Sequence, residues 1–131
     1  MINKNLIIIG KNSFLGSHLY KSPIIKKKLA LSYKKFLKLK DDEISKYNYI
    51  CNCSVHKNYK YKKYLKKYDL DLKIFKKIKH LEIKYIFLSS RKIYKPTFNI
   101  KENNKTKPVD RYARNKLKTE NYLKKYIINK V

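Results

Sequence analysis

Residues 6–20 read LIIIGKNSFLGSHLY, and this stretch decides the fold class of the chain. Its first four residues are an unbroken aliphatic run, which is typical of a strand buried on both faces of a parallel sheet. Gly10 permits a tight turn out of that strand, and Gly16 permits a following helix to pack closely on the sheet. The pattern predicts a strand, a turn and a helix whose N-terminal amides face an anionic group.

The rest of the chain alternates between strand-like and helix-like segments. Further strands are expected at residues 29–33, 36–39 (a short one), 49–55 and 85–88. Helices are expected from residue 41, at 64–80 and at 111–129, with a loop over 96–108. This alternation predicts one α/β domain over residues 1–131, with a doubly wound parallel sheet and helices on both faces.

Ligands of such sheets bind beyond the carboxyl ends of the strands. Gly10, Ser54 and the pair Ser89–Ser90 each follow an expected strand directly. We therefore expect these residues to line one edge of the sheet, where a dinucleotide would lie.

The composition allows a second interpretation. The chain of 131 residues has a formal net charge of +26, from 35 Lys and Arg against 9 Asp and Glu, which is a pattern of nucleic-acid-binding proteins. However, residues with AT-rich codons (Lys, Asn, Ile, Tyr) are abundant, glycine is scarce, and the lysines are spread along the chain. Codon bias therefore explains the charge without a change of function. In either case the surface attracts anions, including nucleotides, and nucleic acid non-specifically.

No targeting or metal-binding pattern is evident in the sequence. The longest aliphatic run is far shorter than the ~20 apolar residues of a membrane span, and a glycine turn follows it in place of a cleavage site. Cys51 and Cys53 lie two apart without clustered histidines, which indicates reduced cysteines and not a metal site. We expect a cytoplasmic protein that uses neither a membrane nor a metal.

A tyrosine and a lysine with helical spacing lie near the C-terminus. Tyr112 and Lys116 are one turn apart, so they share a helix face. A lysine ammonium beside a phenol lowers the pKa of that phenol, which would let Tyr112 exchange a proton with a substrate hydroxyl. Because the chain has 13 tyrosines and many lysines, the same spacing also arises by chance, as in the lysine-rich stretch that begins at Tyr59.

Four segments in order resemble the extended short-chain dehydrogenase/reductases, in particular the NAD-dependent epimerase/dehydratase family that acts on nucleotide sugars. GKNSFLGSHL resembles the family pattern G-x-x-G-F-I-G-S-x-L, and NYICNCSV resembles D-x-V-I-N-x-A-A. FLSSRKIY resembles S-S-x-x-V-Y, and ENNKTKPVDRYARNKLKTENYL resembles E-x-x-P-x-x-P-x-x-x-Y-x-x-S-K-x-x-x-E. The resemblance implies a Rossmann-like, NAD(P)-binding domain.

The same resemblance implies roles for individual residues. The catalytic set would be Ser90, which binds the reacting oxygen, Tyr112, the acid/base, and Lys116, which supports Tyr112 and holds the nicotinamide ribose. Cofactor binding would fall to Gly10, Ser13, Phe14, Leu15, Gly16, Ser32, Lys34 and Lys116. Ser13 stands in place of the family's middle glycine, where its side chain would either crowd the phosphate or donate a hydrogen bond to it.

The choice between NAD and NADP depends on residues 32–35, which read SYKK. NAD-binding relatives usually have an acidic residue there for the ribose 2′-hydroxyl. Hydroxyl and cationic side chains suit a 2′-phosphate, which favours NADP slightly, although a solvated lysine face would read the same.

The family is much longer than this chain, and Asn115 stands where it usually has serine. We therefore expect a minimal or truncated Rossmann-like form without a substrate domain, in which a partner chain supplies the missing C-terminal part or activity is lost. The leading hypothesis is an NAD(P)-dependent nucleotide-sugar epimerase, dehydratase or reductase. The alternatives are a non-catalytic nucleotide-binding module on the same fold and a small basic nucleic-acid-binding protein.

Overall fold

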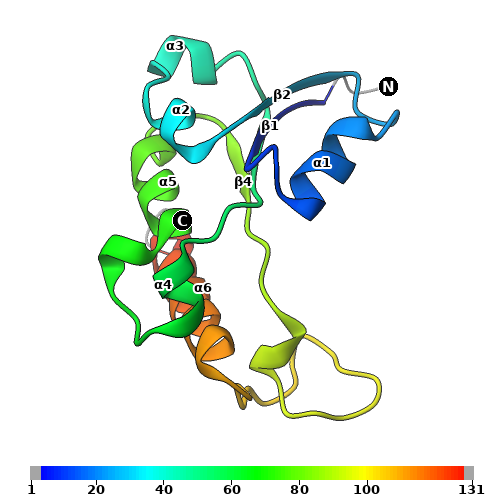
Figure 1. The fold of residues 1–131 in the computed structure, drawn as a ribbon, viewed down its shortest axis with the longest axis vertical. Coiled ribbons are helices and arrows are strands. Elements are labelled where there is room, and N and C mark those ends of the chain that lie inside the picture. The colour runs from blue at the N-terminus through cyan, green and yellow to red at the C-terminus, as the bar shows by residue number, and fades with distance from the viewer. Residues whose placement is uncertain (1–3, 129–131) are drawn as a thin grey trace. The chain divides into compact units, whose positions relative to one another are not determined.

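The computed structural model describes residues 4–128, which fold into two compact units (Figure 1). The first unit comprises residues up to 54 together with 73–88, and the second comprises residues 55–72 together with those from 89 onward. One of the boundaries between the two units, the one after Leu72, therefore lies within a helix. The two units are described separately below.

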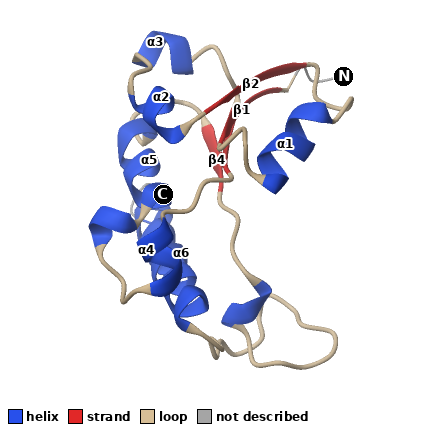
Figure 2. Ribbon diagram, viewed as in Figure 1, coloured by secondary structure: helices blue, strands red, loops and turns tan. Residues whose placement is uncertain are grey.

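The four strands found within residues 4–128 belong to the first unit and form one parallel sheet (Figure 2). They are β1 (Asn5–Ile9), β2 (Lys27–Leu31), β3 (Tyr49–Asn52) and β4 (Lys84–Ile86), in the order β2-β1-β3-β4. This confirms the predicted parallel sheet, in which the aliphatic run of residues 6–9 lies in a central strand paired on both sides.

Alternate residues of β1 enter two different cores, as the two-residue period of a strand requires. Ile7 and Ile9 are fully buried in the larger core, which includes Phe36 and Ile74 from helices. Leu6 and Ile8 are buried on the opposite face, where Leu19 packs against them. Burial on both faces explains why this strand has no polar residue among its last four positions.

Four helices pack in or extend into the first unit. They are α1 (Phe14–Lys21), α2 (Tyr33–Leu37), α3 (Asp41–Ile44) and α5 (Leu70–Ile78). The helix predicted to follow the glycine turn and the helix predicted from residue 41 are confirmed as α1 and α3. Asn52 ends β3 because its side-chain Oδ1 accepts from the amide of Ser54 at 2.9 Å, which turns the chain.

The predicted strands at 29–33, 49–55 and 85–88 are present but extend too far toward the C-terminus, since β2, β3 and β4 end at residues 31, 52 and 86. Two further segments differ in type from the sequence prediction. Residues 36–39 were expected to be a strand, but Phe36 lies in α2, because Ser32 caps that helix: its Oγ accepts from the Lys35 amide at 3.3 Å. Residues 64–80 were expected to form one helix, but a short 3₁₀ turn, η1 (Lys66–Tyr68), precedes α5. Asp69 separates the two because its Oδ1 accepts from the Leu72 amide at 3.0 Å, which starts α5 at Leu70.

The second unit is built around α6 (Arg111–Ile128), against which α4 (Lys57–Tyr61) and the 3₁₀ turn η2 (Arg91–Ile93) pack. The predicted helix at 111–129 is confirmed as far as the structure describes it, since residue 129 lies outside the described range. Residues 96–108 form the predicted loop, with a single bridge from Thr106 to Tyr94. Helix α4 was not predicted; His56 caps it by accepting from the Asn58 amide at 3.1 Å.

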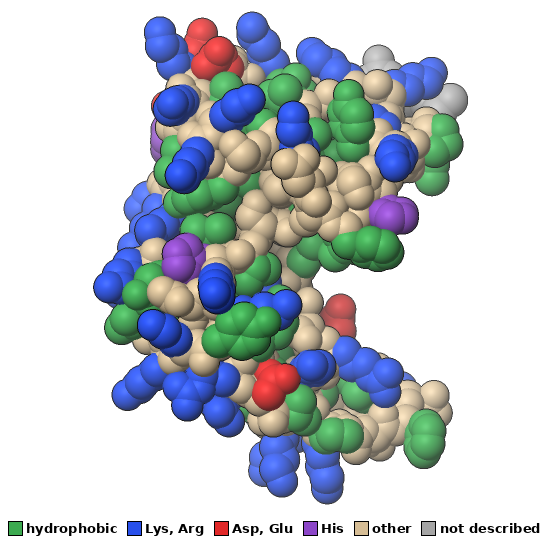
Figure 3. All heavy atoms as spheres, in the orientation of Figure 1, with side chains coloured by type: hydrophobic (Ala, Val, Ile, Leu, Met, Phe, Trp, Pro, Cys, Tyr) green, Lys and Arg blue, Asp and Glu red, His purple; other side chains and the backbone are tan. Residues whose placement is uncertain are grey.

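On the face drawn in Figure 3, lysine and arginine side chains are spread over much of the surface. This agrees with the spread of lysines along the sequence. Of the helices in the described range, none combines the length and the apolar character needed to cross a membrane.

Candidate functional site

The turn between β1 and α1 requires glycine at both ends. Gly10 has φ of +90°, and a side chain on it would meet the Ser54 Oγ at 2.6 Å. A Cβ on Gly16 would lie 2.1 Å from the carbonyl oxygen of Gly10. Helix α1 therefore starts in direct contact with the carboxyl end of β1, as expected of a helix whose N-terminus receives a phosphate.

Ser13 has a structural role in this turn. Its Oγ donates to the Gly10 carbonyl at 2.7 Å and accepts from the Gly16 amide at 3.0 Å, so it caps α1 and closes the turn. The hydroxyl hydrogen is thus used inside the turn. Donation of this hydroxyl to a phosphate would require it to give up its bond to the Gly10 carbonyl, and it stays a prediction.

The first amides of α1 remain suited to an anion. Phe14 and Leu15 occupy the first helical positions, where a backbone N–H has no acceptor within its own helix. Both side chains are exposed (78% and 53%). A turn with two glycines, a capped helix start and outward amides fits the pyrophosphate of a dinucleotide.

The segment after β2 lies beside this turn, because the Gly10 amide donates to the Leu31 carbonyl at 2.8 Å. Ser32 follows directly and caps α2, while Lys34 is exposed. A serine hydroxyl and a free lysine are thus held at the carboxyl end of β2, where the sequence predicted contacts to the ribose of the cofactor.

In the second unit, α6 brings Lys116 and Tyr112 together, as their spacing predicts. The Nζ atom of Lys116 lies 5.8 Å from the centroid of the Tyr112 ring and at the same distance from the ring of Tyr59. The two rings meet edge to face with centroids 6.2 Å apart. Lys116 is buried, at 4% exposure, although a lysine is rarely buried without a partner.

Asp71 is that partner. Its Oδ2 lies 3.6 Å from the Nζ of Lys116, and both side chains are almost completely buried. The expected lowering of the Tyr112 pKa is not found. Instead, burial of the phenol and then the negative charges of Asp71 and Asp110 raise the pKa of Tyr112 above its ordinary value. The aspartate therefore offsets the lysine charge on which the sequence prediction relied.

A chain of hydrogen-bonded side chains, all buried except the half-buried Tyr64, lies in the same unit as this pair. Tyr59 and Thr119 share a 2.6 Å hydrogen bond, and Thr119 donates to Asp69 at 2.6 Å. Tyr64 donates to the same Oδ2 of Asp69, also at 2.6 Å. The pKa values of Tyr59 and Tyr64 are raised, mainly by burial of the phenols and further by the nearby Asp69 carboxylate.

Ser90 lies at the start of η2, which packs against α6. Its Oγ accepts from the Lys92 amide at 3.2 Å, which leaves the hydroxyl hydrogen available for a further acceptor. The neighbouring Ser89 donates instead to Glu120 at 2.8 Å. The role of Ser90 in binding a substrate oxygen stays a prediction.

Sequence reasoning missed the buried acids Asp69 and Asp71, as well as the structural role of Tyr59. A signal was present: the chain has only 9 acidic residues, and two of them alternate with leucines in the segment DLDL. Acids that interrupt an apolar pattern in so basic a chain indicate buried partners for cations.

Comparison with known proteins supports the fold. Neither a protein-family model nor a curated protein sequence matches the chain. Among solved structures, it is similar to a UDP-N-acetylglucosamine 4-epimerase from Methanobrevibacter ruminantium in complex with UDP-N-acetylmuramic acid (TM-score 0.66, 23% identity, 96% of this chain and 51% of that chain covered). It is also similar to a UDP-glucuronic acid 4-epimerase from Bacillus cereus in complex with a UDP-sugar analogue and NAD (TM-score 0.66, 12% identity, 95% and 52% covered).

A third similar structure is a dTDP-4-dehydrorhamnose reductase from Clostridium acetobutylicum (TM-score 0.62, 17% identity, 93% and 49% covered). This chain spans about half the length of each of these chains. At such identities the similarity establishes a Rossmann-like α/β fold, which confirms the predicted fold class.

Proposed function

We propose that the chain is the dinucleotide-binding part of an NAD(P)-dependent oxidoreductase that acts on a nucleotide sugar. The observation that carries the proposal is the turn from Gly10 to Gly16, whose two glycines allow a helix N-terminus to meet the end of a central parallel strand. The similar structures support it, since their names describe epimerases and a reductase of nucleotide sugars, one of them in complex with NAD.

In this proposal, the amides of Phe14 and Leu15 bind the pyrophosphate, and Gly10 and Gly16 keep the backbone close to it. Ser13 holds the turn closed by its two internal hydrogen bonds. Ser32 and Lys34 contact the adenosine ribose, with the lysine charge favouring a 2′-phosphate and therefore NADP. When bound, a nicotinamide dinucleotide supplies hydride transfer.

For catalysis, we assign the proton transfer to the Tyr112 hydroxyl. Because its pKa is raised, Tyr112 is a neutral phenol at neutral pH and therefore acts as a proton donor to a substrate oxygen. Lys116, beside the ring, stabilises the phenolate left behind, and Ser90 donates a hydrogen bond to the same oxygen. Delivery of a proton to a carbonyl oxygen of the substrate accompanies reduction of that carbonyl, so this assignment corresponds to the reductase direction.

A second candidate, a non-catalytic nucleotide-binding module, is favoured by the ion pair between Asp71 and Lys116. With its charge offset, Lys116 supports a phenolate less well. The two candidates share the cofactor site and differ in whether Tyr112 transfers a proton. The strand–turn–helix geometry at Gly10 favours both over a nucleic-acid-binding protein.

Calorimetric titration of the folded chain with NADPH and with NADH tests the shared part of the proposal. We expect binding of both, tighter for NADPH, with Lys34→Gln weakening only NADPH. The matched control is Lys38→Gln, which removes an exposed lysine at the other end of α2 and should change neither affinity. No binding at millimolar cofactor would contradict the proposal, and a preference for NADH would contradict the assignment of Lys34.

A further inference from the structure

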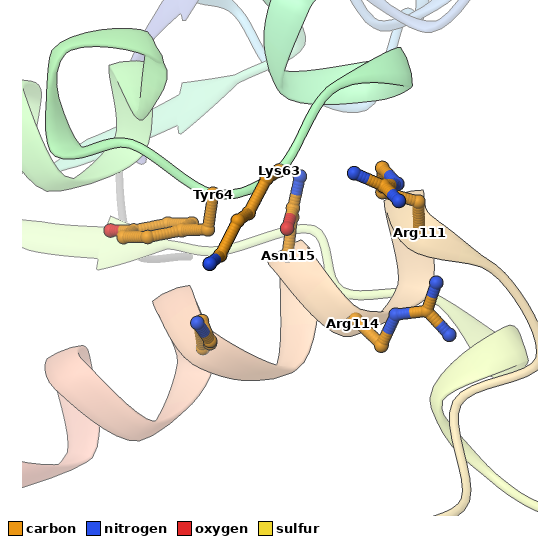
Figure 4. Close-up of a pocket in the computed structure, with 6 residues that line it drawn as sticks. Lys63, Tyr64, Arg111, Arg114 and Asn115 are labelled. Atoms are coloured by element: carbon orange, nitrogen blue, oxygen red, sulfur yellow. The ribbon is translucent and has the colours of Figure 1, made fainter.

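The second unit has an open cavity with a volume of about 270 Å³. None of the residues assigned to catalysis or cofactor binding above lines it. Two of its residues come from the chain between α4 and η1, and the others come from the first two turns of α6 (Figure 4). The lining residues are Lys63, Tyr64, Arg111, Arg114, Asn115 and Lys118.

The arginines of this cavity stand out against the composition of the chain. Of the 35 basic residues only three are arginines, namely Arg91, Arg111 and Arg114. Two of these three line the cavity. A general bias toward lysine explains lysines anywhere on the surface, but it does not explain two arginines in one place. Arginine differs from lysine in its planar fork of donors, which matches the oxygens of a phosphate.

The cavity has an excess of positive charge. Four of its six residues are cationic, and within residues 4–128 no carboxylate forms an ion pair with any of the four. Arg111 and Arg114 also lie in the first turns of α6, at the positive end of its dipole, where cations are unfavourable. Asp110, the residue just before Arg111, caps this helix by accepting from the Ala113 amide at 2.7 Å, and it forms an ion pair with Lys92. An anion in the cavity would relieve this repulsion.

The two sides of the cavity are held together without a ligand. Asn115 is buried, at 2% exposure, and its Nδ2 donates to the carbonyls of Tyr59 at 2.7 Å and Lys62 at 2.9 Å. These bonds tie the chain just before Lys63 to α6. A site that is already shaped loses less conformational entropy when a ligand binds.

We propose that this cavity binds a phosphate or pyrophosphate group of a small molecule, with Arg111 and Arg114 as the principal ligands. Lys63 and Lys118 supply further positive charge, and Asn115 positions the two sides. The site is independent of the dinucleotide turn in the first unit, so either assignment can fail without the other.

The low number of arginines allows a direct test by NMR. The Nε–Hε groups of the three arginines give three signals, which single arginine-to-lysine variants assign. Titration with inorganic pyrophosphate should shift the signals of Arg111 and Arg114 and leave that of Arg91 in place. The proposal would be overturned if all three signals shifted equally or if no signal shifted. Both outcomes are read from the wild-type chain, so they do not depend on whether a variant folds.

Calorimetry with variants of unchanged charge gives a second test. The double variant R111K/R114K should weaken pyrophosphate binding on the order of tenfold, because it removes both guanidinium forks. The matched control R91K makes the same exchange outside the cavity and should have no effect. Equal affinities of the double variant and the control would contradict the proposal. A single-stranded oligonucleotide that shifts the signals of Arg111 and Arg114 where pyrophosphate does not would also refute it, and would indicate a nucleic-acid surface.

Discussion

The Nζ atom of Lys116 lies 3.6 Å from the Oδ2 of Asp71, and both side chains are almost completely buried. This pair joins α6 to the start of α5 within the second unit. Asp71 offsets the charge of the lysine on which proton transfer by Tyr112 would rely, so the pair bears on both stability and function.

Removing one partner of this pair should be strongly destabilising. We expect Asp71→Asn to lower the free energy of unfolding by about 3–5 kcal/mol, since it removes the negative charge 3.6 Å from the buried ammonium of Lys116. Urea unfolding measures the change. The double variant Asp71→Leu/Lys116→Met should recover most of the loss, and a double variant as unstable as the sum of the single ones would show that the pair is not coupled.

Tyr112→Phe tests the assigned acid. The change removes the proton-transfer group and keeps the ring, so any reductase turnover of a nucleotide sugar should fall ~10²–10⁴-fold while cofactor affinity stays the same. Tyr61→Phe, which alters an exposed tyrosine, is the control. Turnover that survives Tyr112→Phe unchanged would refute the mechanism.

The buried tyrosines predict a loss of stability in alkali. Burial raises the pKa of Tyr59 in the folded chain, whereas in the unfolded chain it titrates near its ordinary value of 10.0. The unfolded chain therefore loses the proton first, and the free energy of unfolding falls as pH rises above about 10. Tyr59 contributes a slope of up to about 1.4 kcal/mol per pH unit. Unfolding measured from pH 9 upward should show a shallower decline for Tyr59→Phe than for the wild type, and an unchanged decline for Tyr61→Phe.

Gly16→Ala should disrupt the turn that carries the proposed function. The new Cβ would lie 2.1 Å from the Gly10 carbonyl oxygen, which is backbone and cannot rotate away. We expect a loss of about 1–3 kcal/mol from displacement of α1, together with loss of NADPH binding. Ser17→Ala, one position further along α1, should leave cofactor binding intact. Wild-type affinity in Gly16→Ala would rule out this turn as the pyrophosphate site.

Two substitutions of Ser13 separate its capping role from contact with a ligand. Ser13→Ala should cost about 1 kcal/mol because the α1 cap is lost, and Ser13→Gly only a few tenths, as glycine is tolerated at this position. Since the hydroxyl donates within the turn, Ser13→Gly should bind NADPH at least as tightly as the wild type. A marked loss of affinity in Ser13→Gly would show instead that the serine contacts the cofactor.

Local sequence patterns were sufficient to predict much of the first unit. The aliphatic run of residues 6–9 and the two glycines depend only on neighbours along the chain, and they predicted the central strand, the turn and α1. The prediction of a strand at residues 36–39 was wrong because the apolar pair Phe36–Leu37 fits a short helix equally well once Ser32 caps it. The single-domain prediction stays a prediction beside the two compact units.

By itself, the sequence determined the parallel α/β fold, the strand–turn–helix unit and the closeness of Tyr112 to Lys116, since each follows from periods of two or of three to four residues. Only the tertiary structure decided that Asp71 compensates Lys116 and that Arg111 and Arg114 share a cavity with Lys63. These pairs are far apart in sequence, so the packing of α4, α5 and α6 sets their distances. How strongly a buried charge is compensated depends on which side chains pack against it in the folded chain. The spacing of residues along one helix carries no information about those neighbours.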